Sequence, residues 1–243
     1  MPKSSARIVP KASDRTLVTF LLDRTGSMEP IRDETIGAFN TYLDGLKRDD
    51  APIDFTFLQF DSMSIDKICV AAPVVDVPRL TRDTYQPRAS TPLIDAAYKT
   101  VKAVEDSMAT SPRDKVVICF QTDGEENSSI EHSWNELNAL IKEKAKLGWQ
   151  FNFMGVGIDA YNQGARMGVA PTATVAYDPS DRQATVAAFL ASADNARRYA
   201  RAEANDTDYT PAQRSASRDM FFENVVKKTK RVLKAPIVDD IKL

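Results

Sequence analysis

Residues 16–28 read TLVTFLLDRTGSM, an apolar run that ends in the carboxylate of Asp23 and then in small polar residues. A continuous apolar run of this length is typical of a β-strand that is covered on both faces. After it, apolar side chains recur at helical spacing, which predicts a helix over about 28–48. Because a buried strand followed by a helix forms a β-α unit, this stretch favours an α/β fold.

The rest of the chain repeats this alternation. We predict strands at 53–60, 65–75, 115–123, 149–157 and 172–177, helices at 93–108, 134–147 and 160–167, and a further helix that Ser180 and Gln183 open with a capping box. The turn at 61–64 is short, so the strands around it form a hairpin, and one strand lies antiparallel at an edge. We therefore expect a Rossmann-like, doubly wound α/β sheet, mostly parallel with one antiparallel edge strand, and helices on both faces.

The sequence divides into three parts. Residues 1–14 are polar and predict a flexible lead-in, residues 15–202 hold the alternating pattern of one domain, and residues 203–243 form a C-terminal extension that begins as a polar loop. Within the extension, FFENVVKKTKRVLK at 221–234 has five lysines and arginines against one glutamate, which predicts an amphipathic basic helix. Such a helix can dock on the domain, form an oligomer with a second copy, or bind an acidic partner, nucleic acid or a membrane surface.

Composition places the chain among ordinary globular proteins. Hydrophobic residues make up 43% and charged residues 27%, and the net charge of −2 gives no clear indication of a nucleic-acid partner. No stretch reaches the roughly 18 apolar residues of a membrane span, and the first residues lack the apolar core of a secretory signal. We therefore expect a cytoplasmic protein, although a virion component would have the same features. Cys69 and Cys119 lie in apolar runs and are expected to be buried, reduced thiols.

Small polar residues lie at the ends of two predicted strands and at the start of one predicted helix. Asp23, Thr25 and Ser27 follow the first strand, Thr91 opens a helix, and Asp123 ends a later strand. In open α/β sheets, ligands bind outside the carboxyl ends of the strands, at the point where the strand order reverses. If these strands are neighbours there, the five side chains converge on one crevice. Two carboxylates and three hydroxyls suit a hard cation such as Mg²⁺ or Mn²⁺ better than zinc.

The order and spacing of these residues resemble a known family. Asp-x-Thr-x-Ser at 23–27 is similar to the Asp-x-Ser-x-Ser signature of the von Willebrand factor type A (VWA) domain. The family's second-loop threonine corresponds to Thr91 in RASTPLIDAAY, and its third-loop aspartate to Asp123 in QTDGEEN. The resemblance covers about residues 15–200. It implies a metal-ion-dependent adhesion site in which all five residues hold Mg²⁺, or Mn²⁺ or Ca²⁺, directly or through water.

The sequence departs from the family pattern at two places. Thr25 stands where the family has its first serine, so the hydroxyl is kept and a methyl group is added. Ala89 and Ser90 precede Thr91 where the family usually has glycine, so we expect a stiffer loop.

The resemblance implies a metal-dependent protein-binding module and not an enzyme, in which the bound cation coordinates an acidic residue of a partner protein. Two alternatives stay open. A structural or assembly protein would oligomerise through the fold and the C-terminal extension. A Mg²⁺-dependent, phosphatase-like hydrolase would use Asp23 as its nucleophile, but Thr25 stands where that chemistry needs a second carboxylate.

Several residues of this region also have a simpler interpretation. Thr91, which precedes a proline, resembles an ordinary helix N-cap. Glu125 and Glu126 are expected to favour a helix dipole and not to act directly. Arg24 is expected to face a partner or solvent. His132 is the single histidine, and we expect no metal or general-base role for it.

Overall fold

A computed structural model describes residues 13–157 and 159–222. Six strands form one sheet in the order β3-β2-β1-β4-β5-β6. The strands are β1 (Ser13–Asp23), β2 (Ile53–Phe60), β3 (Ile65–Pro73), β4 (Arg113–Gln121), β5 (Gln150–Val156) and β6 (Thr174–Tyr177). All neighbours pair in parallel except β2 and β3, which are antiparallel at one edge. The predicted fold class, including its antiparallel edge strand, is therefore confirmed.

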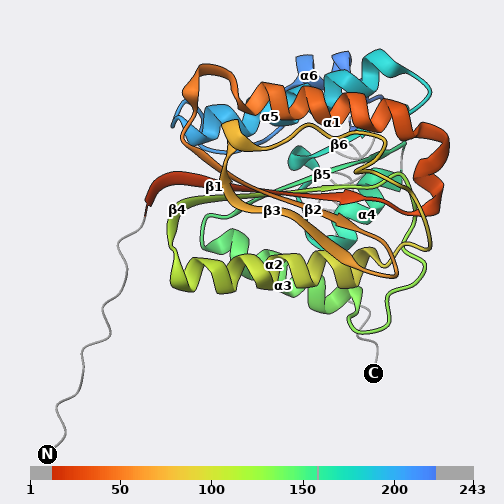
Figure 1. Ribbon diagram of the computed structural model, residues 1–243, viewed down its shortest axis with the longest axis horizontal. Coiled ribbons are helices and arrows are strands. Elements are labelled where there is room, and N and C mark those ends of the chain that lie inside the picture. Colours follow the sequence, from red (N-terminus) through yellow and green to blue (C-terminus); the bar gives the residue numbers. More distant parts are fainter. Residues whose placement is uncertain (1–12, 158, 223–243) are drawn as a thin grey trace, which may run out of the picture.

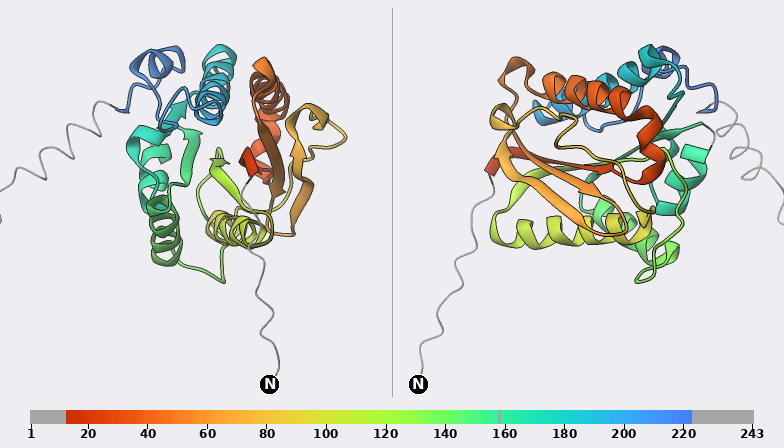
Figure 2. Two further views of the ribbon diagram at one scale, coloured as in Figure 1. Left: turned by 90° about the vertical axis from the view of Figure 1, so that its left-hand side faces the viewer. Right: turned by 45° about the vertical axis from the view of Figure 1, so that its right-hand side comes forward.

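Helices cover both faces of this sheet (Figure 1; Figure 2). α1 (Arg32–Leu46) and α5 (Arg182–Ala200) pack on one face, and α2 (Leu93–Thr110), α3 (Trp134–Lys146) and α4 (Asp159–Met167) pack on the other. A short α6 (Pro211–Ala216) follows α5. The connections contain the 3₁₀ segments η1 (Gly26–Ile31), η2 (Arg48–Asp50), η3 (Val74–Asp76) and η4 (Pro171–Ala173).

The central strand β1 is buried on both faces, as its continuous apolar run predicts. Phe20 has no exposed surface, and its ring lies edge-on to Phe39 and Tyr42 of α1, with centroids 5.4 Å and 4.7 Å away. Leu21, the next residue, belongs to the apolar cluster on the opposite face, which α2 and α3 cover. Each such side chain stabilises the fold by about 1.5–3 kcal/mol. Both layers therefore hold β1, and with it the position of its carboxyl end.

The start of α5 corrects one prediction. Ser180 and Gln183 do not form a capping box, because Asp181 is the N-cap and its carboxylate accepts hydrogen bonds from the N–H groups of Gln183 and Ala184. The Ser180 hydroxyl instead donates to Asp178 at 2.7 Å. Because the Asp181 carboxylate accepts two amide hydrogen bonds, the N-cap lies one residue after Ser180.

The predicted loop after residue 202 contains α6, so this prediction is wrong over 211–216. Thr210 and Gln213 form a capping box around Pro211. The segment packs on the domain, since Arg214 is 4% exposed and donates to the carbonyl oxygens of Pro171, Thr172 and Thr174. The predicted basic helix at 221–234 lies outside the described residues except for its first two.

The two cysteines are free. Cys119 on β4 is buried, but Cys69 is only partly buried because β3 is an edge strand. β2 and β1 separate these two strands, so the thiols are not neighbours in the sheet.

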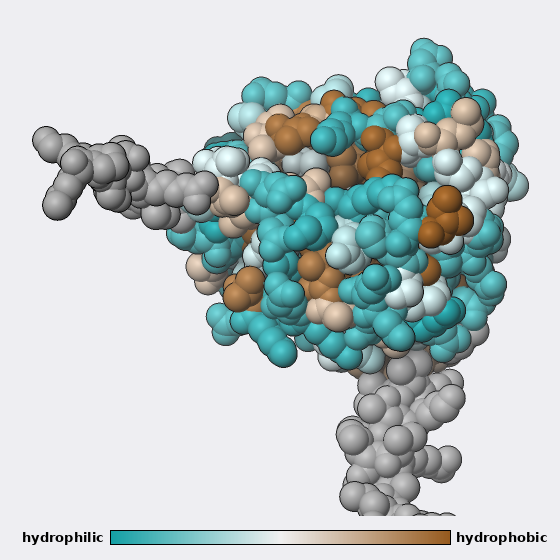
Figure 3. Space-filling model, turned by 90° about the horizontal axis from the view of Figure 1, so that it is seen from below, coloured by the Kyte–Doolittle hydropathy of each residue, from teal (hydrophilic) through white to brown (hydrophobic). Residues whose placement is uncertain are grey.

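The face that α2 and α3 form is largely hydrophilic, with scattered apolar side chains (Figure 3). This agrees with an amphipathic α2, whose Leu93, Ala97, Val101 and Val104 point into the core. Within residues 13–157 and 159–222, the helices are too short or too polar to cross a bilayer.

Close packing of α1 against α5 generates a prediction about two glycines of α1. A Cβ atom on Gly45 would lie 2.8 Å from Cβ of Ala193, whereas one on Gly37 would meet nothing within 4 Å. We expect Gly45→Ala to lower the free energy of unfolding by about 1–3 kcal/mol through overpacking. Gly37→Ala, the matched control on the same helix, should raise it by roughly 0.5–1 kcal/mol. Urea unfolding measures both, and equal effects would contradict the packing.

Candidate metal-binding site

The candidate residues lie at the carboxyl edge of the sheet, where β1 and β4 end side by side. Asp23 is the last residue of β1, and β4 ends two residues before Asp123. Leu22 pairs with Gln121 in the last register position of these strands. The strand order reverses between β1 and β4, because β2 continues the sheet on one side and β5 on the other. This switch point is where open α/β sheets bind ligands.

All five predicted oxygen groups meet at this point. Ser27 Oγ donates a hydrogen bond to Asp123 Oδ1 at 2.8 Å and lies 3.1 Å from Thr25 Oγ1. Thr91 Oγ1 donates to Thr25 Oγ1 at 3.0 Å. Asp23 Oδ1 accepts the N–H of Thr25 at 2.7 Å. Three segments that are far apart in the sequence therefore contribute one connected cluster of hydroxyls and carboxylates.

Asp23 is a carboxylate with no exposed surface. Burial raises its pKa from 3.8 to about 7, although hydrogen bonds from Thr122 and Thr25 lower it in part. Thr122 Oγ1 donates to Asp23 Oδ2 at 2.5 Å, and the hydroxyl of Tyr85 donates to the backbone carbonyl of Asp23 at 2.7 Å. Burial also raises the pKa of Asp123. Both carboxylates thus carry a desolvation cost that a nearby cation would offset.

Thr91 does not act as the helix cap that its position before a proline indicates. α2 begins at Leu93 with Pro92 as its N-cap, without a capping side chain, so the hydroxyl of Thr91 is directed at Thr25. Asn127 holds Thr91 in place, because its Oδ1 accepts the N–H of Thr91 at 2.8 Å and its own N–H donates to the Thr91 carbonyl at 3.1 Å. The Thr91 hydroxyl therefore takes no part in helix capping, and its backbone is held in place beside Thr25.

The loop before Thr91 has no glycine, and the structure shows how it is held. Ala89 has a φ of 60°, in the left-handed region that favours glycine. Its carbonyl accepts the N–H of Gly26 at 3.0 Å, and the N–H of Arg88 donates to the Arg24 carbonyl at 2.9 Å. Ser90 exchanges hydrogen bonds with Ser62 in the turn between β2 and β3. These backbone bonds fix the loop against the residues that follow β1.

Arg24 corrects another prediction, because its side chain is buried and does not face solvent. Its side chain is 8% exposed and donates to Asp61 Oδ2 at 2.8 Å and to Asp66 Oδ2 at 2.7 Å. Arg88 binds the same Asp61 oxygen at 2.9 Å. Burial raises the pKa of Asp61, but hydrogen bonds from Arg88, the Met63 N–H and Arg24 outweigh it and hold the pKa below its usual value. The ion pairs join the loops after β1 and β2.

The two glutamates after Asp123 differ in role. Glu125 is exposed, and Glu126 accepts the N–H of Ile94 at 2.9 Å, so Glu126 caps the start of α2. Glu126 therefore does lie at a helix N-terminus, as expected, but the helix is α2, which precedes Glu126 in the chain. His132 stacks on Tyr98 with ring centroids 3.8 Å apart.

Three supporting residues were missing from the sequence prediction. Thr122 was recognisable, since it adjoins Asp123 at the end of a strand. Tyr85 and Asn127 lie in loops without any local pattern, so only the tertiary structure identifies them.

The residues of the cluster fit a divalent cation. Gly124 leaves the space beside them open, because a Cβ atom there would lie 3.2 Å from Ser27 Oγ and 3.6 Å from Thr91 Oγ1. All donors are oxygens, as hard cations prefer. Within the described part of the chain, no group of three or more histidine, cysteine, aspartate or glutamate residues could hold a metal, so a site here depends on the hydroxyls as well as on two carboxylates.

No model of a known protein family and no curated protein sequence matches this chain. Solved structures do match its fold. A von Willebrand factor type A protein from Catenulispora acidiphila superposes with a TM-score of 0.56 at 12% identity, over 75% of this chain and 43% of that one. This chain has the VWA fold. The manganese-loaded TRAP protein of Plasmodium vivax superposes with a TM-score of 0.52 at 17% identity, over 73% of this chain and 74% of that one.

Proximal thread matrix protein 1 from the mussel byssus gives a TM-score of 0.53 at 14% identity, over 72% of this chain and 45% of that one. This chain thus spans less than half the length of the mussel and Catenulispora chains. At these identities the likeness concerns the fold alone.

The buried ion pairs of Asp61 generate a prediction about two arginines. Arg24→Lys keeps the charge but loses the planar fork that reaches Asp61 and Asp66 together, so the free energy of unfolding should fall by about 1–3 kcal/mol. Arg88 binds the same carboxylate, but its side chain is 47% exposed. Arg88→Lys should therefore lower the free energy of unfolding by less than about 1 kcal/mol. Denaturant unfolding tests the order, and a reversed order would refute the anchoring role of Arg24.

The raised pKa of Asp23 predicts how stability depends on pH in the metal-free protein. Folded Asp23 keeps a proton up to about pH 7 that the unfolded chain releases near 3.8. The free energy of unfolding should therefore fall as pH rises from about 4 to 7, relative to Asp23→Asn, by about 4 kcal/mol at most. Unfolding curves in EDTA measure this difference, and parallel pH profiles would show that Asp23 does not titrate in this way.

Proposed function

We propose that this chain is a metal-dependent protein-binding module. Asp23, Thr25, Ser27, Thr91 and Asp123 would hold one divalent cation, Mg²⁺ or Mn²⁺. When bound, this cation supplies an electropositive position for a carboxylate of a partner protein. The observation that carries the proposal is the connected cluster of three hydroxyls and two carboxylates at the switch point of the sheet. The manganese bound to the Plasmodium protein of the same fold supports this class of ion.

The charge of the donor set favours an acidic ligand from the partner. The three hydroxyls are neutral, so only Asp23 and Asp123 offset a doubly charged cation. Asp23 also accepts hydrogen bonds on both oxygens, from Thr25 and Thr122, and these donors partly offset its negative charge. An ion in such a site keeps an affinity for a further anionic oxygen.

The surroundings of Asp23 favour binding over catalysis. A nucleophilic carboxylate must reach its substrate, but Asp23 has no exposed surface and both of its oxygens are engaged. Thr25 has no carboxylate for proton transfer, and His132 is stacked on Tyr98. Asp23 is therefore not an accessible nucleophile, and Thr25 supplies no general acid two residues after it.

Calorimetry tests this proposal directly. We expect Mg²⁺ and Mn²⁺ to bind the EDTA-treated protein at one saturable site at pH 8, where Asp23 is ionised. Asp23→Ala and Asp123→Ala should abolish the binding while circular dichroism shows an intact fold. Glu125→Ala removes an exposed carboxylate next to the cluster and should leave the affinity unchanged.

The same variants then test the partner. Immobilised wild-type protein should retain a peptide with a central glutamate in Mg²⁺ but not in EDTA, and Asp23→Ala should not retain it. Absence of saturable metal binding by the wild type, or equal loss in Glu125→Ala, would refute the metal site. Turnover of a phosphate ester that depends on Asp23 would favour the hydrolase instead.

A further inference from the structure

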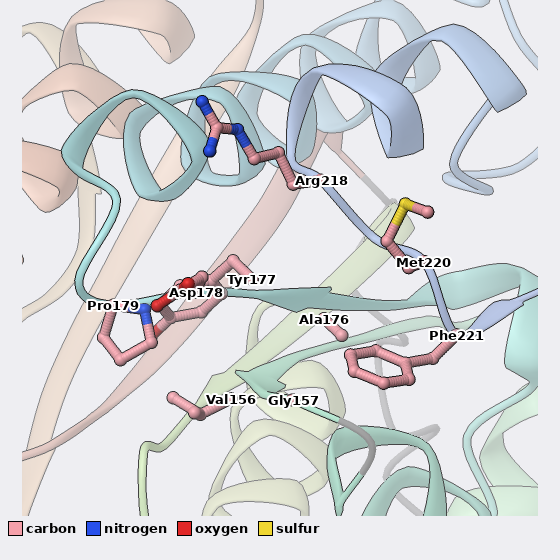
Figure 4. A pocket seen from close by; sticks show the side chains of 9 residues that line it. All are labelled: Val156, Gly157, Ala176, Tyr177, Asp178, Pro179, Arg218, Met220 and Phe221. Carbon is pink, nitrogen blue, oxygen red and sulfur yellow. The ribbon is translucent and has the colours of Figure 1, made fainter.

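An apolar pocket opens on the same edge of the sheet as the candidate metal site. Val156 and Gly157 at the end of β5, and Ala176 and Tyr177 at the end of β6, form one side of it (Figure 4). The segment after α6 forms the other side, where Phe221 lies over the strand ends. Its volume of about 420 Å³ is within the range typical of ligand pockets, about 300–1,000 Å³.

The charged residues that line this pocket are engaged at its rim. Arg218 Nη1 pairs with Asp181 Oδ2 at 2.6 Å, and Figure 4 shows the Arg218 side chain directed away from the strand ends. Asp178 Oδ1 accepts hydrogen bonds from the N–H and the hydroxyl of Ser180, at 2.9 Å and 2.7 Å. The pocket therefore suits an uncharged, apolar group, because a charged group would lose its hydration there without gaining a partner.

The wall of the pocket keeps apolar surface in contact with water. Met220 is 78% exposed, and Val156 and Phe221 are only partly buried, although Ala176 and Tyr177 of the same pocket are buried. Removal of such surface from water is favourable, so a group that covers these side chains gains free energy. A single exposed apolar residue is ordinary, but several that line one concavity mark a binding surface.

The pocket lies close to the cluster of Asp23 and Asp123. Tyr177 lines the pocket, and its hydroxyl accepts a hydrogen bond from Nε2 of Gln121 at 2.8 Å, two residues before Asp123. β1, β4, β5 and β6 are successive neighbours in the sheet. Because neighbouring strands are about 5 Å apart, the ends of β1 and β4, which carry the cluster, lie about 10 Å from the ends of β5 and β6, which carry the pocket.

An extended protein segment has a side-chain period that suits this separation. Side chains two residues apart lie on the same face of a strand, about 7 Å apart along its axis, and adjacent side chains point to opposite faces. The side chains themselves span the remaining distance. A carboxylate and an apolar side chain two residues apart can therefore enter the two sites together, whereas two adjacent side chains cannot.

We propose that the partner carboxylate belongs to an extended segment that has an apolar side chain two residues away. The carboxylate binds at the metal held by the cluster of Asp23, and the apolar side chain fills the pocket beside Phe221. The carboxylate contact rests on the proposed function, whereas the pocket contact needs no metal. Acidic segments without this apolar side chain lack the second contact, so the pocket selects among acidic partners.

Nuclear magnetic resonance of the full-length, ¹⁵N-labelled protein in EDTA tests the pocket contact alone. N-acetyl-leucine amide, which has one apolar side chain and no charge, should shift the amide signals of Gly157 and Ala176. N-acetyl-serine amide at the same millimolar concentration should leave them in place. Leu147, between α3 and β5 at the opposite edge of the sheet, should respond to neither compound. Gly157 and Ala176 signals that ignore the leucine compound, or that respond equally to both, would overturn the proposal.

Two peptides of equal composition test the complete arrangement in Mn²⁺. Each has a central glutamate, two leucines and two serines, and the leucines lie two residues from the glutamate in one peptide but next to it in the other. Leucines on both sides allow for either chain direction. Calorimetry should show that the first peptide binds at least about fivefold more tightly. Met220→Ser should remove most of this difference, whereas Leu147→Ser, which changes a side chain that is 68% exposed at the opposite edge, should preserve it.

The same calorimetry separates the possible failures. Equal affinity of the two peptides for the wild type would overturn the pocket contact, and the proposed metal site would stand. If Mn²⁺ binds but neither peptide does, recognition of a partner carboxylate fails, and if Mn²⁺ does not bind, the metal site fails as well. Both of these results overturn the proposal of one segment that bridges the two sites, while the metal-free spectra decide the pocket contact by itself.

Discussion

A carboxylate without exposed surface stands at the end of a strand that is buried on both faces, and the loops around Asp23 are arranged to satisfy it. Its oxygens accept hydrogen bonds from Thr25 and Thr122, and its carbonyl accepts one from Tyr85. Burial still raises its pKa to about 7, so these donors compensate the loss of water only in part. Thr25 and Thr122 adjoin the other cluster residues, so the donors that satisfy Asp23 also hold the neighbouring parts of the cluster.

Stability and site geometry share the same contacts in this protein. Arg24 lies between two cluster residues, Asp23 and Thr25, yet its side chain is part of a buried ion pair with Asp61. The loop before Thr91 lacks glycine and is fixed by backbone hydrogen bonds to the loops after β1 and β2. A substitution that loosens either anchor would displace the cluster without touching it. Mutations here therefore need a measurement of stability beside any measurement of binding.

The carboxyl edge combines two kinds of surface. The oxygen cluster lies at the ends of β1 and β4, and the apolar pocket lies at the ends of β5 and β6. A hydrogen bond from Gln121 to Tyr177 links the two.

Local pattern was sufficient for the fold class and the antiparallel edge strand, because strand burial has a visible period. It also predicted that the five cluster residues converge, because the ends of parallel strands meet at one edge, while their role as metal ligands stays a prediction. It failed where a local motif had a stronger competitor, as when Asp181 replaced Ser180 as the cap of α5. It also failed where the partner is remote in sequence. The burial of Arg24 depends on Asp61, and the position of Thr91 depends on Asn127. The sequence by itself determined which side chains stand at the strand ends. Only the tertiary structure decided which of them are buried and which partners they bind, because contacts between segments distant in the sequence set both properties.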